Sequence, residues 1–355
     1  MDALARRPKG AKRRAPNSNV GRPALIFKGQ PGALAPYGAL DLGTNNCRLL
    51  IARPALHGLS VVDAYSRIVR LGEGLGLSGT LGEAAMERTI TALRVCSNKL
   101  KWHGVGHRRL IATEACRLAS NGAEFIARVH DEVGLELEII DRATEANLAA
   151  TGASPLIEPG AKSAVIFDIG GGSTEVMWMA QAGERYEIKA WISLASGVVT
   201  LSERLNGGRN VTPESFAAMC AEVKRLLIPF IAEVTELVGS DITPSHLLGT
   251  SGTVTTIVGV HMGLRHYDRG KVDGAWLANG AAGEVTRRLL AMTYEERVAN
   301  GCIGRERADL VLAGCAILEE IRLAFPSPRI RVADRGLREG ILIQLMQGDG
   351  VWSNR

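Results

Sequence analysis

The sequence predicts an α/β fold with two domains, and three observations support this. Apolar segments of strand length alternate with amphipathic helical segments from residue 37 onward, as in proteins that pack helices against sheets. Hydrophobic residues make up 46% of the 355 positions and aromatic residues only 5%, so the core must be aliphatic. A chain of this length is long for one compact core, and its size favours two domains.

The predicted strands are short apolar runs that lead into turns, over 37–42, 49–52, 109–113, 135–139, 164–168, 245–248 and 329–333. In the predicted helices, apolar residues recur every three or four positions. These helices cover 83–103, 122–133, 144–152, 212–238, 307–324 and 336–346.

Pro and Gly concentrate in residues 154–160, the expected linker between the domains. We therefore expect an N-terminal domain over 37–153 and a C-terminal domain over 154–335. The remaining residues, 336–355, are expected to form a C-terminal helix that packs back onto the N-terminal domain.

Residues 1–36 differ in composition from the rest of the chain. They contain eight Lys or Arg residues and a single acid, Asp2, so the other residues carry little of the net charge of +5. Charge runs with Pro and Gly but no apolar periodicity are typical of disordered segments. We expect a disordered basic tail, which either solubilises the protein or contacts polyanions such as nucleic acid or polyphosphate.

The sequence also predicts where the protein works. We find neither a secretory signal nor the roughly 18 consecutive apolar residues that a membrane span requires. The six cysteines lack the paired spacing of a zinc site or a disulfide framework. These features predict a cytoplasmic protein with reduced thiols.

One short pattern occurs twice in the chain. Asp41-Leu42-Gly43 and Asp168-Ile169-Gly170 each follow an apolar strand and precede another. Each copy places a carboxylate at the end of a strand and a Gly two residues later, where the chain must turn sharply. Two similar halves that each carry such a turn are expected to set two polar loops face to face across a cleft.

The second copy continues into a loop suited to binding phosphate. Three consecutive glycines, 170–172, leave backbone N–H groups open to an anion, and Ser173 and Thr174 add hydroxyl donors. Asp168 and Glu175 flank the loop with carboxylates that suit Mg²⁺ or an attacking water. A plain glycine turn is the alternative, but three glycines cost backbone entropy that a simple turn does not require.

A third loop of small residues, 249–256, leads from a predicted strand into a predicted helix. The start of a helix offers free N–H groups and the positive end of the helix dipole, which favour an anion. An ordinary capped helix has much the same sequence, so this loop is a weaker signal alone.

Two other nucleotide-binding patterns fit poorly. The dinucleotide-binding G-x-G-x-x-G pattern requires a helix after the glycines, but residues 176–179 resemble a strand. The P-loop pattern G-x-x-x-x-G-K-[ST] does not occur in the sequence.

Together the motifs resemble those of the exopolyphosphatase/guanosine pentaphosphate phosphohydrolase (Ppx/GppA phosphatase) family. The matching segments, in the order found in the family, are A-L-D-L-G-T-N (39–45), T-E-A-C-R (113–117), F-D-I-G-G-G-S-T-E (167–175), G-T-S-G-T (249–253) and D-R-G-L-R-E-G (334–340). The resemblance implies a two-domain actin-like ATPase (ribonuclease H-like) fold, shared with sugar kinases and heat-shock chaperones, with its active site in the interdomain cleft. It also implies a homodimeric hydrolase that depends on Mg²⁺ or another divalent cation such as Mn²⁺.

The family places its catalytic glutamate in a G-x-E-E-A-R segment ahead of the second Asp loop. The corresponding residues here, 142–147, are R-A-T-E-A-N, which keep Glu145 but replace the Gly, the first Glu and the Arg. The resemblance makes Glu145 the general base for the attacking water. Without the resemblance, Glu145 would look like an ordinary surface acid on a helix.

Several arginines are candidates for binding phosphate. Arg117 follows a predicted strand and either forms charge-assisted bonds to phosphate or makes a surface ion pair. Arg305, Arg307, Arg335 and Arg338 lie near the last two predicted helices, but the sequence does not show which of them face the cleft.

The predicted site thus has one general base, Glu145, and three metal ligands, Asp41, Asp168 and Glu175. The predicted phosphate-binding residues are Gly43, Thr44, Asn45, Arg117, Gly170, Gly171, Gly172, Ser173, Thr174, Ser251, Gly252 and Thr253.

These residues predict an exopolyphosphatase that releases orthophosphate from the end of inorganic polyphosphate. Three alternatives remain open: a guanosine pentaphosphate (pppGpp) 5′-phosphohydrolase, a non-catalytic sensor that binds polyphosphate or pppGpp, and an ATP-dependent kinase on the same fold.

Overall fold

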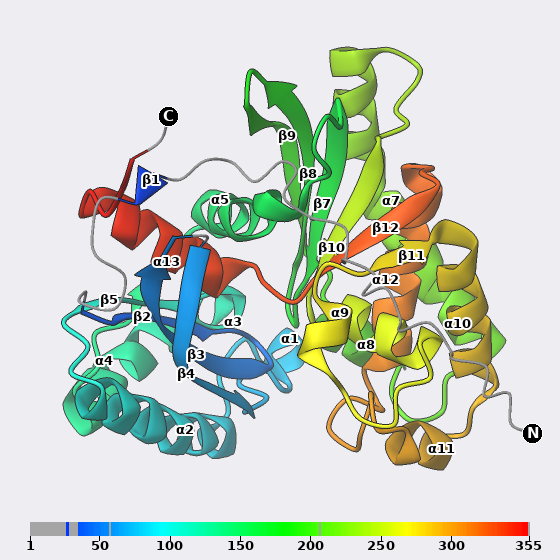
Figure 1. Ribbon diagram of the computed structural model, residues 1–355. Coiled ribbons are helices and arrows are strands. Elements are labelled where there is room, and N and C mark those ends of the chain that lie inside the picture. The colour runs from blue at the N-terminus through cyan, green and yellow to red at the C-terminus, as the bar shows by residue number, and fades with distance from the viewer. Residues whose placement is uncertain (1–25, 28–34, 57, 206, 354–355) are drawn as a thin grey trace, which may run out of the picture.

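A computed structural model describes residues 26–27, 35–56, 58–205 and 207–353 of the chain. It shows two α/β halves, each built on its own mixed sheet. In Figure 1 the N-terminal half, in blue and cyan, lies beside the C-terminal half, in green, yellow and orange.

The first sheet has five strands in the order β4-β3-β2-β5-β6. The antiparallel part consists of β2 (Tyr37–Leu42), β3 (Asn46–Ala55) and β4 (Gly58–Ile68). The parallel part adds β5 (His107–Ala112) and β6 (Glu138–Ile139) on the other side of β2. Buried aliphatic residues of these strands form one core with α2 (Glu83–Trp102) and α4 (Gly122–Val133).

The second sheet repeats this topology and adds one edge strand. The antiparallel part is β7 (Ser163–Ile169), β8 (Thr174–Ala182) and β9 (Arg185–Leu194). The parallel part is β10 (His246–Thr250) and β12 (Arg329–Ala333), with β11 (Trp276–Ala278) antiparallel at the edge. The repeated Asp-x-Gly pattern therefore marks a repeat of the sheet topology, because both copies end the central strand of their half.

Helices of the second half form its larger core. The helix α7 (Pro213–Val238) packs against α12 (Val311–Ala324), and the aromatic rings of Phe230 and Phe325 meet edge to face at 5.5 Å. The remaining helices of this half are α6 (Val198–Arg204), α8 (Gly252–His261), α9 (Arg269–Val272), α10 (Asn279–Ala291) and α11 (Tyr294–Ala299).

Two helices, α5 (Arg142–Ala153) and α13 (Leu337–Gly348), join the halves. The C-terminal helix α13 returns to the first sheet, where Ile341 and Leu342 pack with residues of β2 and β3. Alanines of α5 pack instead on the second sheet, against β7 and β8. Each half is thus covered partly by a helix that belongs to the other part of the sequence.

Glycines allow α5 and α13 to approach at backbone distance. A Cβ atom at Gly152 would lie 1.9 Å from the carbonyl oxygen of Gly336, and one at Gly340 would lie 1.9 Å from that of Leu148. Real Cβ atoms cannot come this close, so only glycine fits at these two positions. The crossing therefore fixes the two halves relative to each other.

Near the termini, β1 (Ile26–Phe27) pairs antiparallel with β13 (Trp352–Ser353). This strand is an exception to the disordered tail that the sequence predicts over residues 1–36, of which 1–25 and 28–34 lie outside the described residues. Among the helices of the described ranges, none combines the length and the apolar character that a membrane span requires.

Candidate active site between the two halves

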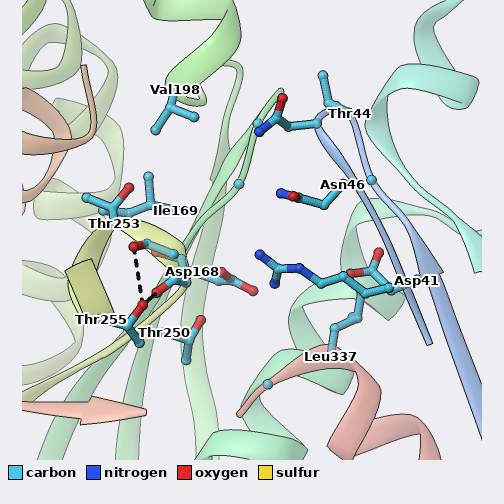
Figure 2. A pocket seen from close by; sticks show the side chains of 18 of the residues that line it. Asp41, Thr44, Asn46, Asp168, Ile169, Val198, Thr250, Thr253, Thr255 and Leu337 are labelled. Atoms are coloured by element: carbon cyan, nitrogen blue, oxygen red, sulfur yellow. Dashed lines mark hydrogen bonds between the residues drawn. The ribbon is translucent and has the colours of Figure 1, made fainter. Parts of the chain in front are cut away.

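A cleft of about 360 Å³ lies between the two halves. Its walls are the loops after β2, β7 and β10, together with the N-terminal end of α13. Figure 2 shows Asp41, Thr44 and Asn46 of the first half on one side and Asp168, Thr250 and Thr253 of the second half on the other. The face-to-face arrangement predicted from the repeated turns is present.

The two Asp-x-Gly loops touch each other across the cleft. A Cβ atom at Gly171 would lie 3.1 Å from the backbone nitrogen of Asn45, and one at Gly172 would lie 2.6 Å from Oγ1 of Thr44. The glycines at these positions therefore serve the close approach of the loops. Side chains there would force the halves apart.

The loop of the second half is oriented by α6. The N–H groups of Val198 and Val199 donate to the carbonyl oxygens of Gly170 and Gly171, at 2.9 and 2.8 Å. No hydrogen bond within the described part of the chain uses the N–H groups of Gly171 or Gly172. The loop thus has its carbonyl groups occupied and the N–H groups of Gly171 and Gly172 available, as an anion-binding turn requires.

Several buried polar atoms of the cleft have no partner among the described residues. Among them are Thr44 Oγ1, Asn45 Oδ1 and Ser251 Oγ. Buried polar groups in folded proteins are almost always hydrogen-bonded, because leaving one unpaired costs about 1–3 kcal/mol. Three such atoms in one cleft indicate that a polar ligand completes the site.

Backbone strain occurs at the same place. Ser251, at the N-cap of α8, has φ 102°, in the region that favours glycine. Such a conformation costs about 1–3 kcal/mol and persists where the surroundings enforce it, often at functional sites.

Seven carboxyl groups line the cleft. Four are the predicted site residues Asp41, Glu145, Asp168 and Glu175, and the others are Glu114, Asp334 and Glu339. Burial raises the pKa of Asp41 to about 6 and that of Glu145 to about 7. Burial also raises the pKa of Asp168, and it raises that of Glu175 well above its usual value. Negative charges nearby add to the effect, since Asp41 and Asp168 both raise the pKa of Glu145. A cation or a protonated carboxyl would relieve this repulsion.

The predicted metal ligands do not form a complete cage. Within the described ranges, no group of three or more His, Cys, Asp or Glu side chains lies close enough to hold a metal ion. Mg²⁺ is usually held by one or two carboxylates, with water and substrate phosphate completing an octahedron. Asp41 and Asp168 can serve in this way, whereas Oε1 of Glu175 already accepts bonds from Ser173 and Ser193, at 2.8 and 2.9 Å.

Glu145 lies in the first turn of α5, and its side chain is 12% exposed. Asp141 is the N-cap of this helix, and its carboxylate accepts from the N–H of Thr144 at 2.7 Å. One carboxylate oxygen of Glu145, Oε2, accepts from Nη2 of Arg117 at 3.0 Å. The other oxygen makes no hydrogen bond with the described residues and is available to a water in the cleft.

Most of the predicted site residues line the cleft, but Arg117 and Thr174 do not. Arg117 donates to Glu114, Glu145 and the carbonyl oxygen of Ile140. The hydroxyl of Thr174 donates to the carbonyl oxygen of Ser196 at 2.7 Å. The predicted residues that do line the cleft are Asp41, Gly43, Thr44, Asn45, Glu145, Asp168, Gly170, Gly171, Gly172, Ser173, Glu175, Ser251, Gly252 and Thr253.

Arginines line the cleft as well. Of the four candidates from the sequence, Arg307, Arg335 and Arg338 line the cleft and Arg305 does not. Arg48 and Arg269 also line it, although the sequence analysis did not single them out. The hairpin register places Arg48 directly opposite Asp41, and this pairing is the signal that could have identified it. The side chains of Arg48 and Arg338 make no hydrogen bond within the described part of the chain, whereas Nη1 of Arg307 donates to Oγ1 of Thr256 at 3.2 Å.

The two halves share one sheet topology, carry a duplicated Asp-x-Gly turn that faces a polar cleft, and are joined by a crossing helix. These features define a protein of the actin-like class. Comparison with known proteins narrows this class. The model of the Ppx/GppA phosphatase family matches residues 50–348. The exopolyphosphatase 2 of Mycobacterium tuberculosis is 31% identical over 330 residues, covering 88% of this chain and 99% of that protein.

Solved structures agree with this assignment. An exopolyphosphatase from Cytophaga hutchinsonii superposes with a TM-score of 0.80 at 26% identity, over 90% of this chain and 100% of that one. The Aquifex aeolicus member of the Ppx/GppA family gives a TM-score of 0.72 at 28% identity, over 89% and 98%. The chain therefore belongs to the Ppx/GppA phosphatase family.

Proposed function

We propose that the protein is an exopolyphosphatase, which hydrolyses the terminal phosphoanhydride bond of inorganic polyphosphate and releases orthophosphate. The observation that carries this proposal is the combination of unpartnered donors with a free carboxylate oxygen. Thr44 and Ser251 line the cleft with buried hydroxyl groups that have no partner among the described residues, and Glu145 has one unbonded oxygen. The hydroxyl donors suit the oxygens of a phosphate, and the free carboxylate oxygen suits a water.

Substrate binding falls to the three loops and the arginines. The N–H groups of Gly171 and Gly172 and the hydroxyl groups of the cleft donate to the oxygens of the terminal phosphate. Arg48 and Arg338 supply positive charge on the side of the first half. Phosphoryl transfer depends mainly on such positioning and charge neutralisation, since the phosphorus–oxygen bond loosens with little covalent help from the protein.

Glu145 orients the attacking water and accepts its proton. Arg117 fixes one oxygen of this carboxylate, so the other can accept from a water without reorienting. A pKa of about 7, raised by burial, matches the requirement that a general base titrate near the working pH.

A divalent cation fits the donor set of the cleft. Asp41 and Asp168 would hold it, and the bound ion would neutralise charge on the phosphate and on these carboxylates. The mutual repulsion of the cleft carboxylates supports this assignment, because it weakens when a cation binds.

Phosphate release from a panel of substrates tests the proposal. The panel contains polyphosphates of graded length, pppGpp and ATP, each with and without Mg²⁺ and without any acceptor. Release from polyphosphate that depends on Mg²⁺ is the expected result. Faster release from pppGpp would make the protein a pppGpp 5′-phosphohydrolase, and binding without release would make it a sensor. ATP turnover only with an acceptor would make it a kinase.

A further inference from the structure

A buried carboxylate in the wall of the cleft is linked to Glu145 through Arg117. Glu114, the first residue of α3 (Glu114–Leu118), is 2% exposed. Its carboxylate accepts hydrogen bonds from two guanidinium groups. Arg142 donates from Nη2 to Oε1 at 2.7 Å, and Arg117 donates from Nε to Oε2 at 3.0 Å.

Arg117 is shared between two carboxylates. Its Nη2 donates to Glu114 and also to Oε2 of Glu145 at 3.0 Å. Arg142, in contrast, forms an ion pair only with Glu114 among the described residues. The four side chains therefore form a chain in the order Arg142, Glu114, Arg117 and Glu145, in which positive and negative charges alternate.

The alternation balances the charges around Glu145. Burial alone would raise the pKa of Glu114, but hydrogen bonds from Arg142 and then Arg117 outweigh it and hold this pKa below its ordinary value. A buried charge that loses one of its ion-pair partners destabilises the fold, and its interaction with the remaining partner becomes stronger. If Arg142 were absent, Glu114 would compete more strongly with Glu145 for Arg117.

Arg142 stands where the G-x-E-E-A-R pattern has a glycine. It does not line the cleft, and its side chain is 39% exposed. Its influence on substrate must therefore pass through Glu114 and Arg117.

We propose that Arg142 is a positioning residue, which neutralises Glu114 so that Arg117 can hold Glu145 in line with the attacking water. This inference rests on the proposed role of Glu145 as the general base. It concerns the rate of the chemical step rather than the binding of substrate.

The first test compares two variants of Arg142 on polyphosphate with Mg²⁺. Arg142→Ala should lower kcat about tenfold, the scale of coupling between groups in one charged network. KM should change less than twofold, since Arg142 does not line the cleft. Arg142→Lys should recover part of the loss because it keeps the charge without the two-nitrogen contact. Arg288→Ala, at an exposed arginine of α10, is the matched control and should leave kcat unchanged.

The second test separates positioning from a structural role. Removing the charge of Glu114 removes the need for Arg142, so the double variant Glu114→Gln/Arg142→Ala should have a higher kcat than Arg142→Ala, within about threefold of wild type. A double variant no better than Arg142→Ala overturns the inference, as does an Arg142→Ala variant with wild-type kcat.

The outcomes also separate this inference from the proposed function. An active wild type with an unaffected Arg142→Ala variant contradicts the positioning role alone. A wild type that releases no phosphate contradicts the proposed function, and the positioning role with it.

Discussion

Replacing Glu145 with glutamine removes the general base with little other change. Gln has nearly the same volume as Glu, and its amide oxygen can still accept from Nη2 of Arg117, which lies 3.0 Å from Oε2 in the structure. The carboxylate charge and the proton acceptor are lost. A positioned general base contributes roughly 10²–10⁴ to the rate, so kcat of Glu145→Gln should fall at least a hundredfold.

Binding should survive the same substitution. Asp41 and Asp168 repel the charge of Glu145, so a neutral Gln relieves this repulsion and leaves the phosphate-binding loops in place. Malachite-green detection of phosphate measures turnover, and calorimetric titration with polyphosphate measures affinity. A variant with turnover within a few-fold of wild type would show that another group activates the water.

The remaining predictions concern pH and two glycines. Because Glu145 must be ionised to act as a base, kcat should rise with pH. The midpoint should lie at or below the pKa of about 7, since a bound cation would lower that pKa. A rate that falls over pH 5–7 would contradict this role. Gly340→Ala places a Cβ 1.9 Å from the carbonyl oxygen of Leu148 and should destabilise the fold by about 2 kcal/mol, measured by thermal unfolding. Gly348→Ala, in the same helix but with open space around it, should not lower the Tm; equal effects would mean that the helix crossing tolerates side chains. Gly171→Val should weaken polyphosphate binding because its side chain meets Asn45 on the facing loop, and unchanged affinity in the same titration would contradict the contact.

The cleft could be predicted from the sequence because each Asp-x-Gly turn is a local signal. A strand end, a carboxylate and a Gly needed for a sharp turn all lie within a few residues, and the repeat of that unit implies two loops of the same kind. That these loops touch through Gly171 and Gly172 could not be predicted, since the contact joins residues more than 120 positions apart.

Two arginines, Arg117 and Arg48, show a different limit of prediction from the sequence. Arg117 was expected either to bind phosphate or to pair with an acid, and the choice depended on Glu114 and Glu145, which lie three positions and 28 positions away. Arg48 gave no signal as a single residue, although its register opposite Asp41 follows from the hairpin. Long-range charge pairing decides the role of both side chains, and sequence periodicity does not report it.

Some strands and helix ends were also missed. The strand β4 alternates only weakly between apolar and polar residues because it lies at the edge of its sheet, and all of its residues are at least partly exposed. The helix predicted over 307–324 begins only at Val311, since residues 304–310 form tight turns ahead of it. Those turns place Arg307 at the cleft.

Phosphorus NMR of the wild-type protein with long-chain polyphosphate and Mg²⁺ tests the proposed chemistry most directly, because orthophosphate, terminal and internal phosphate give separate signals. Cleavage at the chain end should produce orthophosphate from the first minutes, without oligophosphates of intermediate length. A spectrum that stays unchanged, or that shows short oligophosphates before orthophosphate, would contradict terminal hydrolysis in this cleft.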